Sequence, residues 1–440
     1  MTDETKRTRV SFISLGCFKN LVDTEVLGGM LEKKNIDIVS DYEETDWLVI
    51  NTCGFVRDAK EESIAEILEA LEKKSAGEIP HVAVFGCLTQ RYHAELSNTF
   101  SGADIIWGVN DLEELASIIV GERQGGYRDR NPFLYDHRHH RILTTTPNTT
   151  FLKISEGCSM PCSFCAIPLI RGPYRSRDIA SIVEEARGYR ERGFHELNLI
   201  SQNTTFFGRE GGGPSRLPDL LAAISELGFT WVRLLYLMPE EVDDALIEAF
   251  DLPSILPYFD LPFQHVAPGV LKRMKRGGGV TRNMRLIEKI RSRHPDAVIR
   301  STFIVGFPGE TEADHELLCR FARDAGIERI GVFGYSAEEN TAAFGLDGTL
   351  PEETILARRE MLMDISDDNM AAFNRRILTS RRRFLPLGPW ENNSTVGRID
   401  CQAPEVDGLT RVQAPFDEDG APYEIRLTAF NNELLTGEKT

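Results

Sequence analysis

The stretch FLKISEGCSMPCSFC, residues 151–165, carries the strongest signal in the sequence. Its first four residues predict a short strand, and Cys158, Cys162 and Cys165 follow in the spacing C-x3-C-x2-C. Three thiolates so close in the chain can converge on one metal centre, but structural zinc uses four ligands. A 4Fe–4S cluster held by three cysteines keeps one iron open to a small molecule. The spacing therefore favours such a cluster; the alternatives are a zinc loop completed by a distant residue and a chance grouping.

Downstream of these motif cysteines, apolar strands alternate with helical patterns. Counting the strand that opens the motif, short apolar runs predict strands at 151–154, 197–200, 231–237, 258–262, 299–305 and 330–333. Repeated strand–helix units predict a partial or open (βα)6 barrel, with functional groups at the C-terminal ends of the strands. The polar residues at those ends are candidates for contact with a cofactor or substrate, although each could equally serve the fold: Gln202, Asn203, Gln264, His265, Arg300 and Tyr335.

Upstream of the motif, the sequence predicts a second α/β unit. Apolar strands at 10–15, 47–50 and 82–85 alternate with helical patterns, as in a parallel sheet. A cysteine follows each of these strands: Cys17, Cys53 and Cys87. Carboxyl ends of parallel strands share one edge of the sheet, and adjacent strands lie roughly 5 Å apart, so these strand-end cysteines could share one metal centre. The alternative is three buried cysteines that happen to end strands. The remaining cysteines, Cys319 and Cys401, are predicted to be structural.

The C-terminal part of the chain predicts a long helix and then a small all-β domain. The helical pattern covers 351–378, and short strands follow at 396–399, 409–412 and 423–427. Residues 391–440 hold ten Asp or Glu and only four Lys or Arg, which suits a basic protein partner better than a nucleic acid. We therefore expect three domains, at residues 8–124, 144–374 and 377–440.

Composition places the chain among globular proteins. Of 440 residues, 41% are hydrophobic and 27% charged, and the net charge of −18 argues against binding dominated by nucleic-acid phosphates. No run of 18 apolar residues predicts a membrane span, and the polar N-terminus lacks a signal-peptide core. We expect a cytoplasmic protein, in which eight cysteines serve as metal ligands, catalytic groups or buried apolar residues rather than disulfides.

The motif cysteines after a strand that opens a (βα)6 unit resemble those of the radical S-adenosylmethionine (radical SAM) enzymes. In that family the three cysteines hold a 4Fe–4S cluster whose open iron binds the amino and carboxylate groups of S-adenosylmethionine. An electron from the cluster then breaks the bond from sulfur to C5′ and yields a 5′-deoxyadenosyl radical.

The strand-end cysteines narrow this resemblance to the methylthiotransferases, whose C-terminal β-barrel is called TRAM. The likeness covers essentially the whole chain and implies a parallel-sheet α/β domain, a radical-SAM partial TIM barrel and a small antiparallel β-barrel. Several stretches are similar to the RimO type, which modifies a ribosomal protein: residues 14–23, 51–55, 59–63, 153–158, 261–265 and 332–336. One departure is Phe18, where the family often has proline after the first cysteine.

The resemblance implies the cofactors and the reaction. The motif cysteines would bind the radical-generating 4Fe–4S cluster, and the strand-end cysteines an auxiliary 4Fe–4S cluster that carries sulfide or a short polysulfide. One S-adenosylmethionine would methylate that sulfur, and a second would supply the radical that removes hydrogen from the substrate, which then couples with the methylthio group. Contacts to S-adenosylmethionine or substrate are predicted for Gln202, Asn203, Gln264 and Arg300, and no catalytic side chain is assigned beyond the cluster ligands.

The resemblance also implies the substrate and partners. The substrate would be C3 of one aspartate in small-subunit ribosomal protein S-twelve, free or in the ribosome, and the product 3-methylthioaspartate. An electron donor such as flavodoxin or ferredoxin would supply the electron, and neither a membrane nor dominant nucleic-acid binding is expected. Three alternatives stay open: a tRNA adenosine methylthiotransferase, a non-catalytic metal-cluster protein of the ribosome, and a radical enzyme whose second cluster only relays electrons.

Overall fold

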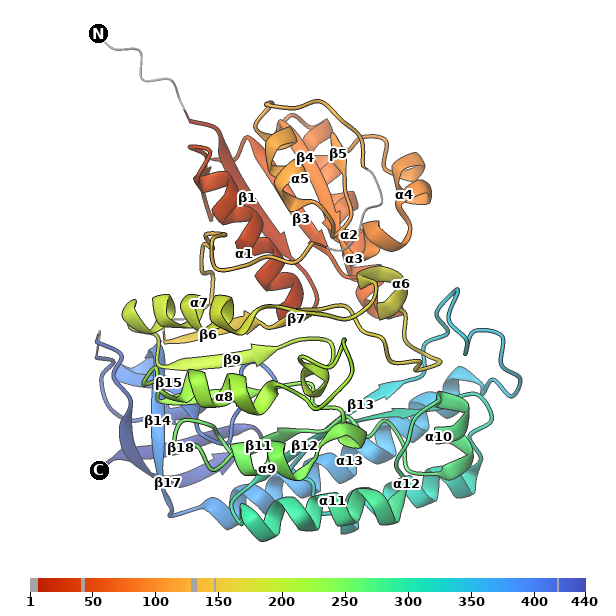
Figure 1. Cartoon of the computed structure of the whole chain (residues 1–440), viewed down its shortest axis with the longest axis vertical. Helices are drawn as coiled ribbons and strands as arrows, with labels where there is room; N and C mark the ends of the chain where they lie inside the picture. The colour runs from red at the N-terminus through yellow and green to blue at the C-terminus, as the bar shows by residue number, and fades with distance from the viewer. Residues whose placement is uncertain (1–6, 41–43, 128–132, 146–147, 418) are drawn as a thin grey trace. The chain divides into compact units, whose positions relative to one another are not determined.

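The computed structural model describes residues 7–40, 44–127, 133–145, 148–417 and 419–440. The chain forms two compact units (Figure 1). Unit 1 comprises residues 1–144, 155–160 and 165–182, and unit 2 comprises residues 145–154, 161–164 and 183–440. No helix among the described residues is both long and apolar enough to cross a membrane.

Unit 1 is built on a five-stranded parallel sheet. Its strand order is β2-β1-β3-β4-β5. The strands are β1 (Arg9–Ser14), β2 (Asp37–Ile38), β3 (Trp47–Thr52), β4 (His81–Gly86) and β5 (Ile105–Ile106). The parallel sheet predicted from the apolar runs is therefore confirmed, and the short strands β2 and β5 extend it at both edges.

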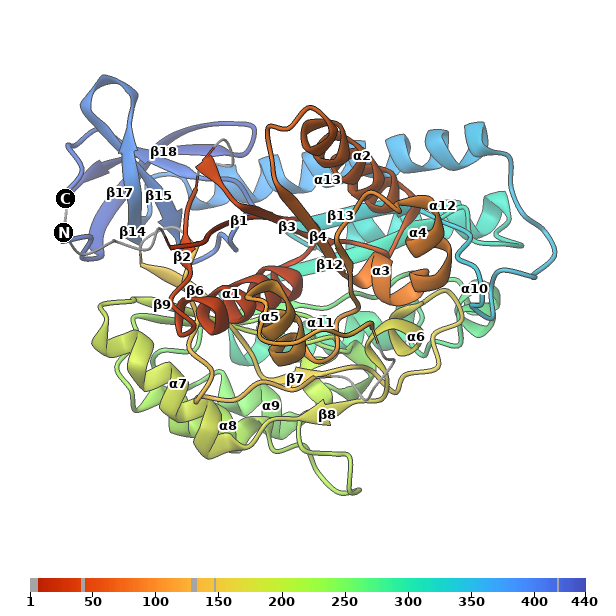
Figure 2. The same ribbon diagram turned by 90° about the horizontal axis from the view of Figure 1, so that it is seen from above.

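Helices cover both faces of this sheet. They are α1 (Phe18–Glu32), α2 (Arg57–Ser75), α3 (Cys87–Arg91), α4 (His93–Thr99) and α5 (Leu112–Ile119). Figure 2 shows α2 on one face and α1 and α5 on the other. On the α2 side, Ile67 packs with Ile50 and Val84, and all three are at most 1% exposed. Burial on both faces explains why the strands are continuously apolar rather than alternating.

A segment before the motif packs on α1 in the same unit. Arg141 donates from Nη2 to Oε2 of Glu25 at 2.5 Å, and both side chains are almost fully buried. The backbone amide of Thr144 donates to the other oxygen of Glu25 at 2.8 Å. The remainder of unit 1 contains α6 (Ile167–Arg171) and an antiparallel pair of short strands, β7 (Ser155–Glu156) and β8 (Arg175–Ser176).

Unit 2 contains six parallel strands in two sheets, ordered β10-β9-β6 and β11-β12-β13. Backbone hydrogen bonds from Leu256 to Val232 and from Leu237 to Asp260, both 2.9 Å, join β10 to the β11 side. The strands thus follow one another in chain order, as predicted for a (βα)6 partial barrel. They are β6 (Thr149–Lys153), β9 (Glu196–Ile200), β10 (Trp231–Leu234), β11 (Tyr258–Asp260), β12 (Val298–Val305) and β13 (Arg329–Gly334).

Helices alternate with these strands. They are α7 (Ile179–Glu191), which begins in unit 1, α8 (Leu217–Ser225), α9 (Asp244–Ala249), α10 (Pro268–Met274), α11 (Val280–Arg293), α12 (Glu312–Asp324) and α13 (Glu352–Ile377). Single 3-10 turns lie at Thr204–Phe206, Pro239–Glu241 and Glu391–Asn393. Thr311 begins α12 with a capping box to Asp314, which satisfies backbone donors that would otherwise lack a partner.

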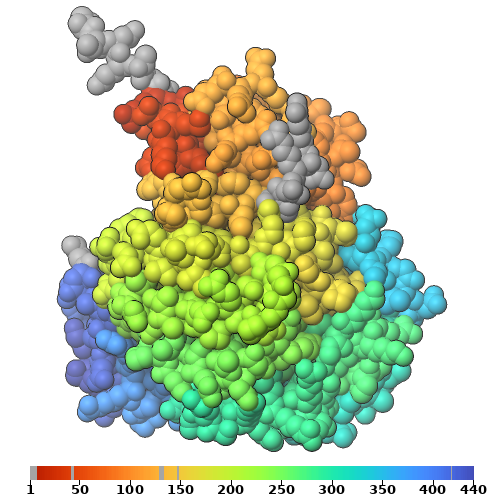
Figure 3. All heavy atoms as spheres, in the orientation of Figure 1, coloured from red at the N-terminus to blue at the C-terminus, as the bar shows by residue number. Residues whose placement is uncertain are grey.

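The C-terminal strands close into a barrel in the order β14-β15-β16-β18-β17. They are β14 (Arg381–Trp390), β15 (Ser394–Ile399), β16 (Thr410–Val412), β17 (Tyr423–Asn431) and β18 (Leu434–Lys439). The predicted small β-barrel is confirmed, with one parallel pair, β16 with β18, among antiparallel ones. In the space-filling view, this blue segment borders the green residues of the same unit (Figure 3).

The sequence patterns do not predict two strands of the barrel, β14 and β18. Pro386 and Pro389 argue against a strand, and the pairing of β14 shifts register between Pro386 and Gly388 to accommodate them. Because β14 begins at Arg381, the basic run 381–383 belongs to the barrel. The excess of acidic residues is therefore smaller for the whole barrel than for residues 391–440 alone.

Candidate functional site

The three strand-end cysteines lie at one edge of the unit 1 sheet. Cys17 precedes α1, Cys53 directly follows β3, and Cys87 directly follows β4 as the first residue of α3. Because β1, β3 and β4 are neighbours in the sheet, the fold brings these positions together as the sequence predicts. Cys17 is exposed, whereas Cys53 and Cys87 are buried.

A glycine beside each of these cysteines permits the close packing of the strand ends. Gly16 has a φ of +88°, and a Cβ built on it would lie 2.8 Å from the Cβ of Cys53. A Cβ on Gly54 would lie 2.7 Å from the Cα of Leu88. Gly86 also adopts a positive φ, of +116°. Only glycine tolerates such a backbone and such contacts, so the pairing of glycine with cysteine is a usable sequence signal for this site.

The buried sulfurs of this edge influence one another. The pKa of the Cys53 thiol is raised to about 12, first by burial and then by the neighbouring Cys87. Burial also raises the pKa of Cys87, although the Arg171 guanidinium opposes the rise. Both thiols therefore stay protonated near neutral pH unless a cation replaces the proton, and binding a metal or cluster here must release protons.

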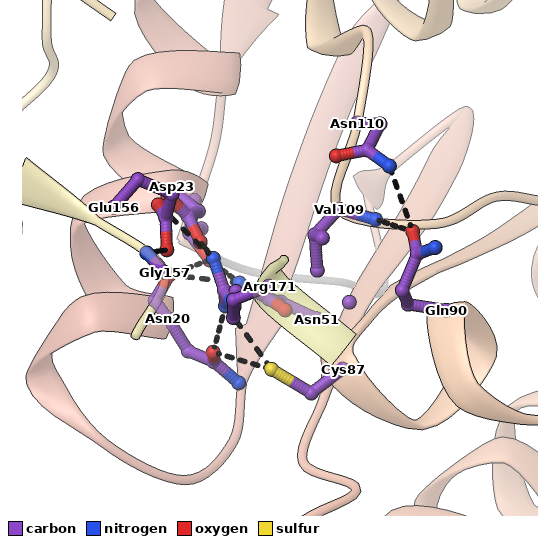
Figure 4. A network of polar contacts seen from close by, with 12 residues as sticks. Asn20, Asp23, Asn51, Cys87, Gln90, Val109, Asn110, Glu156, Gly157 and Arg171 are labelled. Carbon is purple, nitrogen blue, oxygen red and sulfur yellow. Dashed lines mark hydrogen bonds and ion pairs between the residues drawn. The ribbon is translucent and has the colours of Figure 1, made fainter. Parts of the chain in front are cut away.

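Arg171, the last residue of α6, reaches the sheet edge and was not singled out by the sequence (Figure 4). Its Nη2 donates to Sγ of Cys87 at 3.1 Å and to Oδ1 of Asn20 at 2.7 Å. Its Nη1 donates to Asp23 at 2.5 Å and lies 3.5 Å from a carboxylate oxygen of Glu156. An arginine six residues after the last motif cysteine thus touches one of the strand-end cysteines.

Asn20 connects the strand ends to one another. Its side-chain nitrogen donates to the carbonyl oxygens of Leu15 and Thr52, at 3.0 and 3.1 Å. Its Oδ1 accepts from the Cys87 thiol at 3.3 Å, and its backbone carbonyl accepts from Asn51 at 2.7 Å. Polar side chains therefore hold the loops after β1 and β3 in register with Cys87.

The motif cysteines divide between the two units. In unit 1, Cys158 is buried and its backbone amide donates to the carbonyl of Gly172 at 3.1 Å; Cys165 is partly buried. In unit 2, burial raises the pKa of Cys162, while Arg276 beside it opposes the rise. Arg276 is held by two hydrogen bonds to Glu240, at 2.9 and 3.0 Å.

The donor chemistry of the six cysteines fits two thiolate-ligated clusters. The strand-end cysteines lie at one sheet edge, and the motif cysteines lie within eight residues of chain. In the part of the chain that the structure describes, no three His, Cys, Asp or Glu side chains are arranged to hold a single metal ion. The assignment of the six cysteines to clusters stays a prediction.

Of the four predicted cofactor or substrate contacts, Gln202, Asn203 and Gln264 follow strands of unit 2. The prediction that Arg300 lies at the C-terminal end of its strand is wrong, because Arg300 is the third residue of β12. Two of the four bind neighbouring side chains. Asn203 donates to Glu241 at 2.9 Å, and Arg300 donates to Asp260 at 2.9 Å. Gln264 has a φ of +68°, and Gln202 follows β9. Their role toward a cofactor stays a prediction.

Tyr236, just beyond β10, is a further residue of this edge that the sequence did not indicate. Its φ is +62°, and its backbone amide donates to Oδ2 of Asp260 at 2.8 Å. A non-glycine residue in the left-handed region costs about 1–3 kcal/mol, and such strain is typical of functional edges. Tyr236 and Gln264 thus mark the carboxyl ends of two strands, where ligands bind in this class of fold.

Comparisons with known proteins agree with this arrangement. Residues 9–108 match the model described as Uncharacterized protein family UPF0004, and residues 152–322 match the Radical SAM superfamily. The ribosomal protein uS12 methylthiotransferase RimO of Symbiobacterium thermophilum is 40% identical, covering 98% of this chain and 91% of that protein. The protein of the same name from Geobacter sulfurreducens is 37% identical, covering 98% of both chains.

Solved structures share the fold at low identity. The radical S-adenosylmethionine methyltransferase TsrM from Kitasatospora setae, with cobalamin and a 4Fe–4S cluster bound, aligns with a TM-score of 0.57 and 15% identity. The alignment covers 77% of each chain. The same protein with its tryptophan substrate and a S-adenosylmethionine analogue gives a TM-score of 0.56.

Proposed function

We propose that this chain, which belongs to the RimO family of radical S-adenosylmethionine methylthiotransferases, transfers a methylthio group to ribosomal protein uS12. One observation carries the proposal. The chain is similar to that family over nearly its whole length, and it contains both the strand-end cysteines and the motif cysteines. Cys17, Cys53 and Cys87 follow neighbouring strands at one sheet edge, and the motif cysteines lie in the segment that matches the Radical SAM superfamily.

We place the new carbon–sulfur bond at C3 of one aspartate, which would become 3-methylthioaspartate. The hydrogen on that carbon is not acidic enough for an ordinary base while the side chain is a carboxylate, so hydrogen-atom abstraction suits the reaction. When bound, the cluster of the motif cysteines supplies an electron to cleave S-adenosylmethionine, and the auxiliary cluster supplies sulfur. The chain itself positions these groups and excludes water from them.

The remaining partners follow from the same proposal. The C-terminal barrel, residues 381–440, holds ten acidic and seven basic residues, and this acidic excess favours docking of a basic ribosomal protein over a nucleic acid. A one-electron donor such as flavodoxin or ferredoxin would reduce the motif cluster. Because the substrate belongs to the ribosome, we place the reaction in the cytoplasm. Gln202, Asn203, Gln264 and Arg300 remain the proposed contacts to S-adenosylmethionine or substrate.

Anaerobic reconstitution tests the two-cluster proposal directly. About eight irons per chain should fall to about four when Cys17, Cys53 and Cys87 are changed to Ala, as expected for two 4Fe–4S clusters. That variant should still form 5′-deoxyadenosine but should not modify uS12. About four irons in both proteins would contradict the auxiliary cluster.

A substrate comparison tests the acceptor. Mass spectrometry of uS12 incubated with the enzyme, S-adenosylmethionine and reductant should show one added methylthio group on an aspartate. Bulk tRNA, treated in parallel, should stay unmodified. Modification of tRNA adenosine with uS12 unchanged would favour the tRNA methylthiotransferase instead.

A further inference from the structure

The guanidinium of Arg171 is a buried positive charge, and its two terminal nitrogens contact different kinds of partner. Only 2% of the residue is exposed, and a buried cation is tolerated only when it is paired and hydrogen-bonded. Nη1 faces two carboxylates, Asp23 and Glu156, whereas Nη2 faces the Asn20 amide oxygen and the Cys87 sulfur. The carboxylates alone would satisfy the charge, so the contact with sulfur calls for a separate explanation.

The same short helix also packs apolar residues against Cys87. Ala166, the residue just before α6, and Ile170 of α6 form a buried cluster with Cys87 and Val109 of the N-terminal part of unit 1. The backbone that carries Cys165 therefore leads directly into a helix that is docked on a strand-end cysteine. Arg171 provides the polar part of this docking and the apolar residues provide the rest.

We propose that Arg171 is a positioning residue that holds Cys87 as a ligand of the auxiliary cluster and tunes the reduction potential of that cluster. This inference rests on the proposed function, because it assumes a cluster on the strand-end cysteines. A hydrogen bond and a positive charge at a ligating sulfur stabilise the more negative, reduced form of an iron–sulfur cluster. Arg171 therefore raises the reduction potential of the auxiliary cluster.

The geometry requires arginine rather than any cation. The planar guanidinium presents one nitrogen to Asp23 at 2.5 Å and the other to Asn20 and Cys87 at 2.7 and 3.1 Å. A lysine ammonium is a single point donor and cannot satisfy both sides in this way. Arg171→Lys should therefore keep part of the electrostatic effect but lose the fixed position.

The test uses full-length protein in which Cys158, Cys162 and Cys165 are changed to Ala, so that only the auxiliary cluster is loaded. Its reduction potential is measured by redox titration with electron paramagnetic resonance. Arg171→Met should shift the potential to more negative values, and Arg171→Lys should shift it less. Asp23→Asn should shift the potential in the opposite direction, because it removes a negative charge beside the same guanidinium.

Arg141→Met is the matched control. Arg141 is also a buried arginine of unit 1, and it is paired with the carboxylate of Glu25. Its loss should lower stability but leave the potential unchanged. Opposite shifts for the Arg171 and Asp23 variants cannot arise from general loosening of the fold.

The outcomes separate the two proposals. An unchanged potential in Arg171→Met, or an equal shift in Arg141→Met, would overturn the role of Arg171. Loss of iron from folded Arg171 variants while Arg141→Met keeps its iron would support it, since Arg171 would then be needed to hold Cys87. A parent protein that binds no iron would contradict the two-cluster proposal itself and this inference with it.

Discussion

Two networks in this molecule pair buried arginine side chains with carboxylates, but the other partners of the arginines differ. In unit 1, Arg171 lies between carboxylates and the Cys87 sulfur. In unit 2, Glu196 of β9 lies between Arg233 of β10 and Arg398 of β15. Both networks bury charge almost completely, but only the first ends on a sulfur atom. Burial of a charge is therefore not evidence of function by itself, whereas the chemistry of its partners is.

The Glu196 network fastens the C-terminal barrel to the six-stranded part of unit 2. Arg398 donates to Oε1 of Glu196 at 3.1 Å and to the carbonyl of Gln402 at 3.1 Å. Arg233 donates to the carbonyls of Asp400 and Gln402, at 3.1 and 3.0 Å. Every one of these acceptors is an oxygen. The network therefore joins barrel and strands and offers no group suited to a cluster.

Glu196→Gln should produce the largest loss of stability. It would leave two buried guanidinium groups facing a neutral amide, which costs about 3–5 kcal/mol in the free energy of unfolding. Chemical denaturation measures this loss, and Glu61→Gln, which removes an exposed pair with Arg57, is the control with an effect below about 0.5 kcal/mol. The cluster potentials should not change; a shift in them would erase the distinction between the two networks.

Acid should weaken the Glu196 network selectively. Burial alone would raise the pKa of Glu196, but Arg398 and Arg233 outweigh it and lower the pKa from 4.5 to about 2. A lowered folded-state pKa contributes stability that is present above pH 4.5 and is lost as the pH falls toward 2. That contribution is about 3 kcal/mol. Unfolding free energies should fall more steeply over this pH window in the parent than in Glu196→Gln; parallel curves would show that Glu196 is not ionised.

Gly16→Ala should disturb the sheet edge in unit 1 that carries Cys17, Cys53 and Cys87, because it strains the backbone there. The added Cβ would lie 2.8 Å from the Cβ of Cys53, at a φ of +88° that alanine rarely adopts. We expect a loss of about 1–3 kcal/mol in stability and partial loss of the auxiliary iron. The matched variant Gly188→Ala, on α7 with nothing within 4 Å of the new Cβ, should keep its iron. Full iron content in Gly16→Ala would show that the sheet edge is less constrained than its packing implies.

Much of the fold could be predicted because it follows from local patterns. Apolar runs such as 47–50 and 82–85 predicted β3 and β4, and the cysteine after each strand indicated a candidate site at one sheet edge. The strands of the partial barrel were found in the same way. Within the C-terminal barrel, Pro386 and Pro389 hid β14, because proline is normally evidence against a strand.

The partners of the site could not be predicted in this way. Arg171 contacts Cys87 across 84 positions of sequence and Asn20 across 151, and nothing local distinguishes it from other arginines. The sequence also does not predict the left-handed backbone conformations of Tyr236 and Gln264, since neither is a residue type that favours such a conformation.

The sequence by itself determined the central strands of both parallel sheets, the spacing of the motif cysteines and the glycine beside each strand-end cysteine, because periodicity and backbone freedom act over a few residues. Only the tertiary structure decided which buried charges meet. Arg398 reaches Glu196 across 202 positions, and Arg171 reaches Cys87, because the packing of whole elements leaves each guanidinium its partners. Desolvation then makes those pairings obligatory, since an unpaired buried charge costs more free energy than the fold can spare.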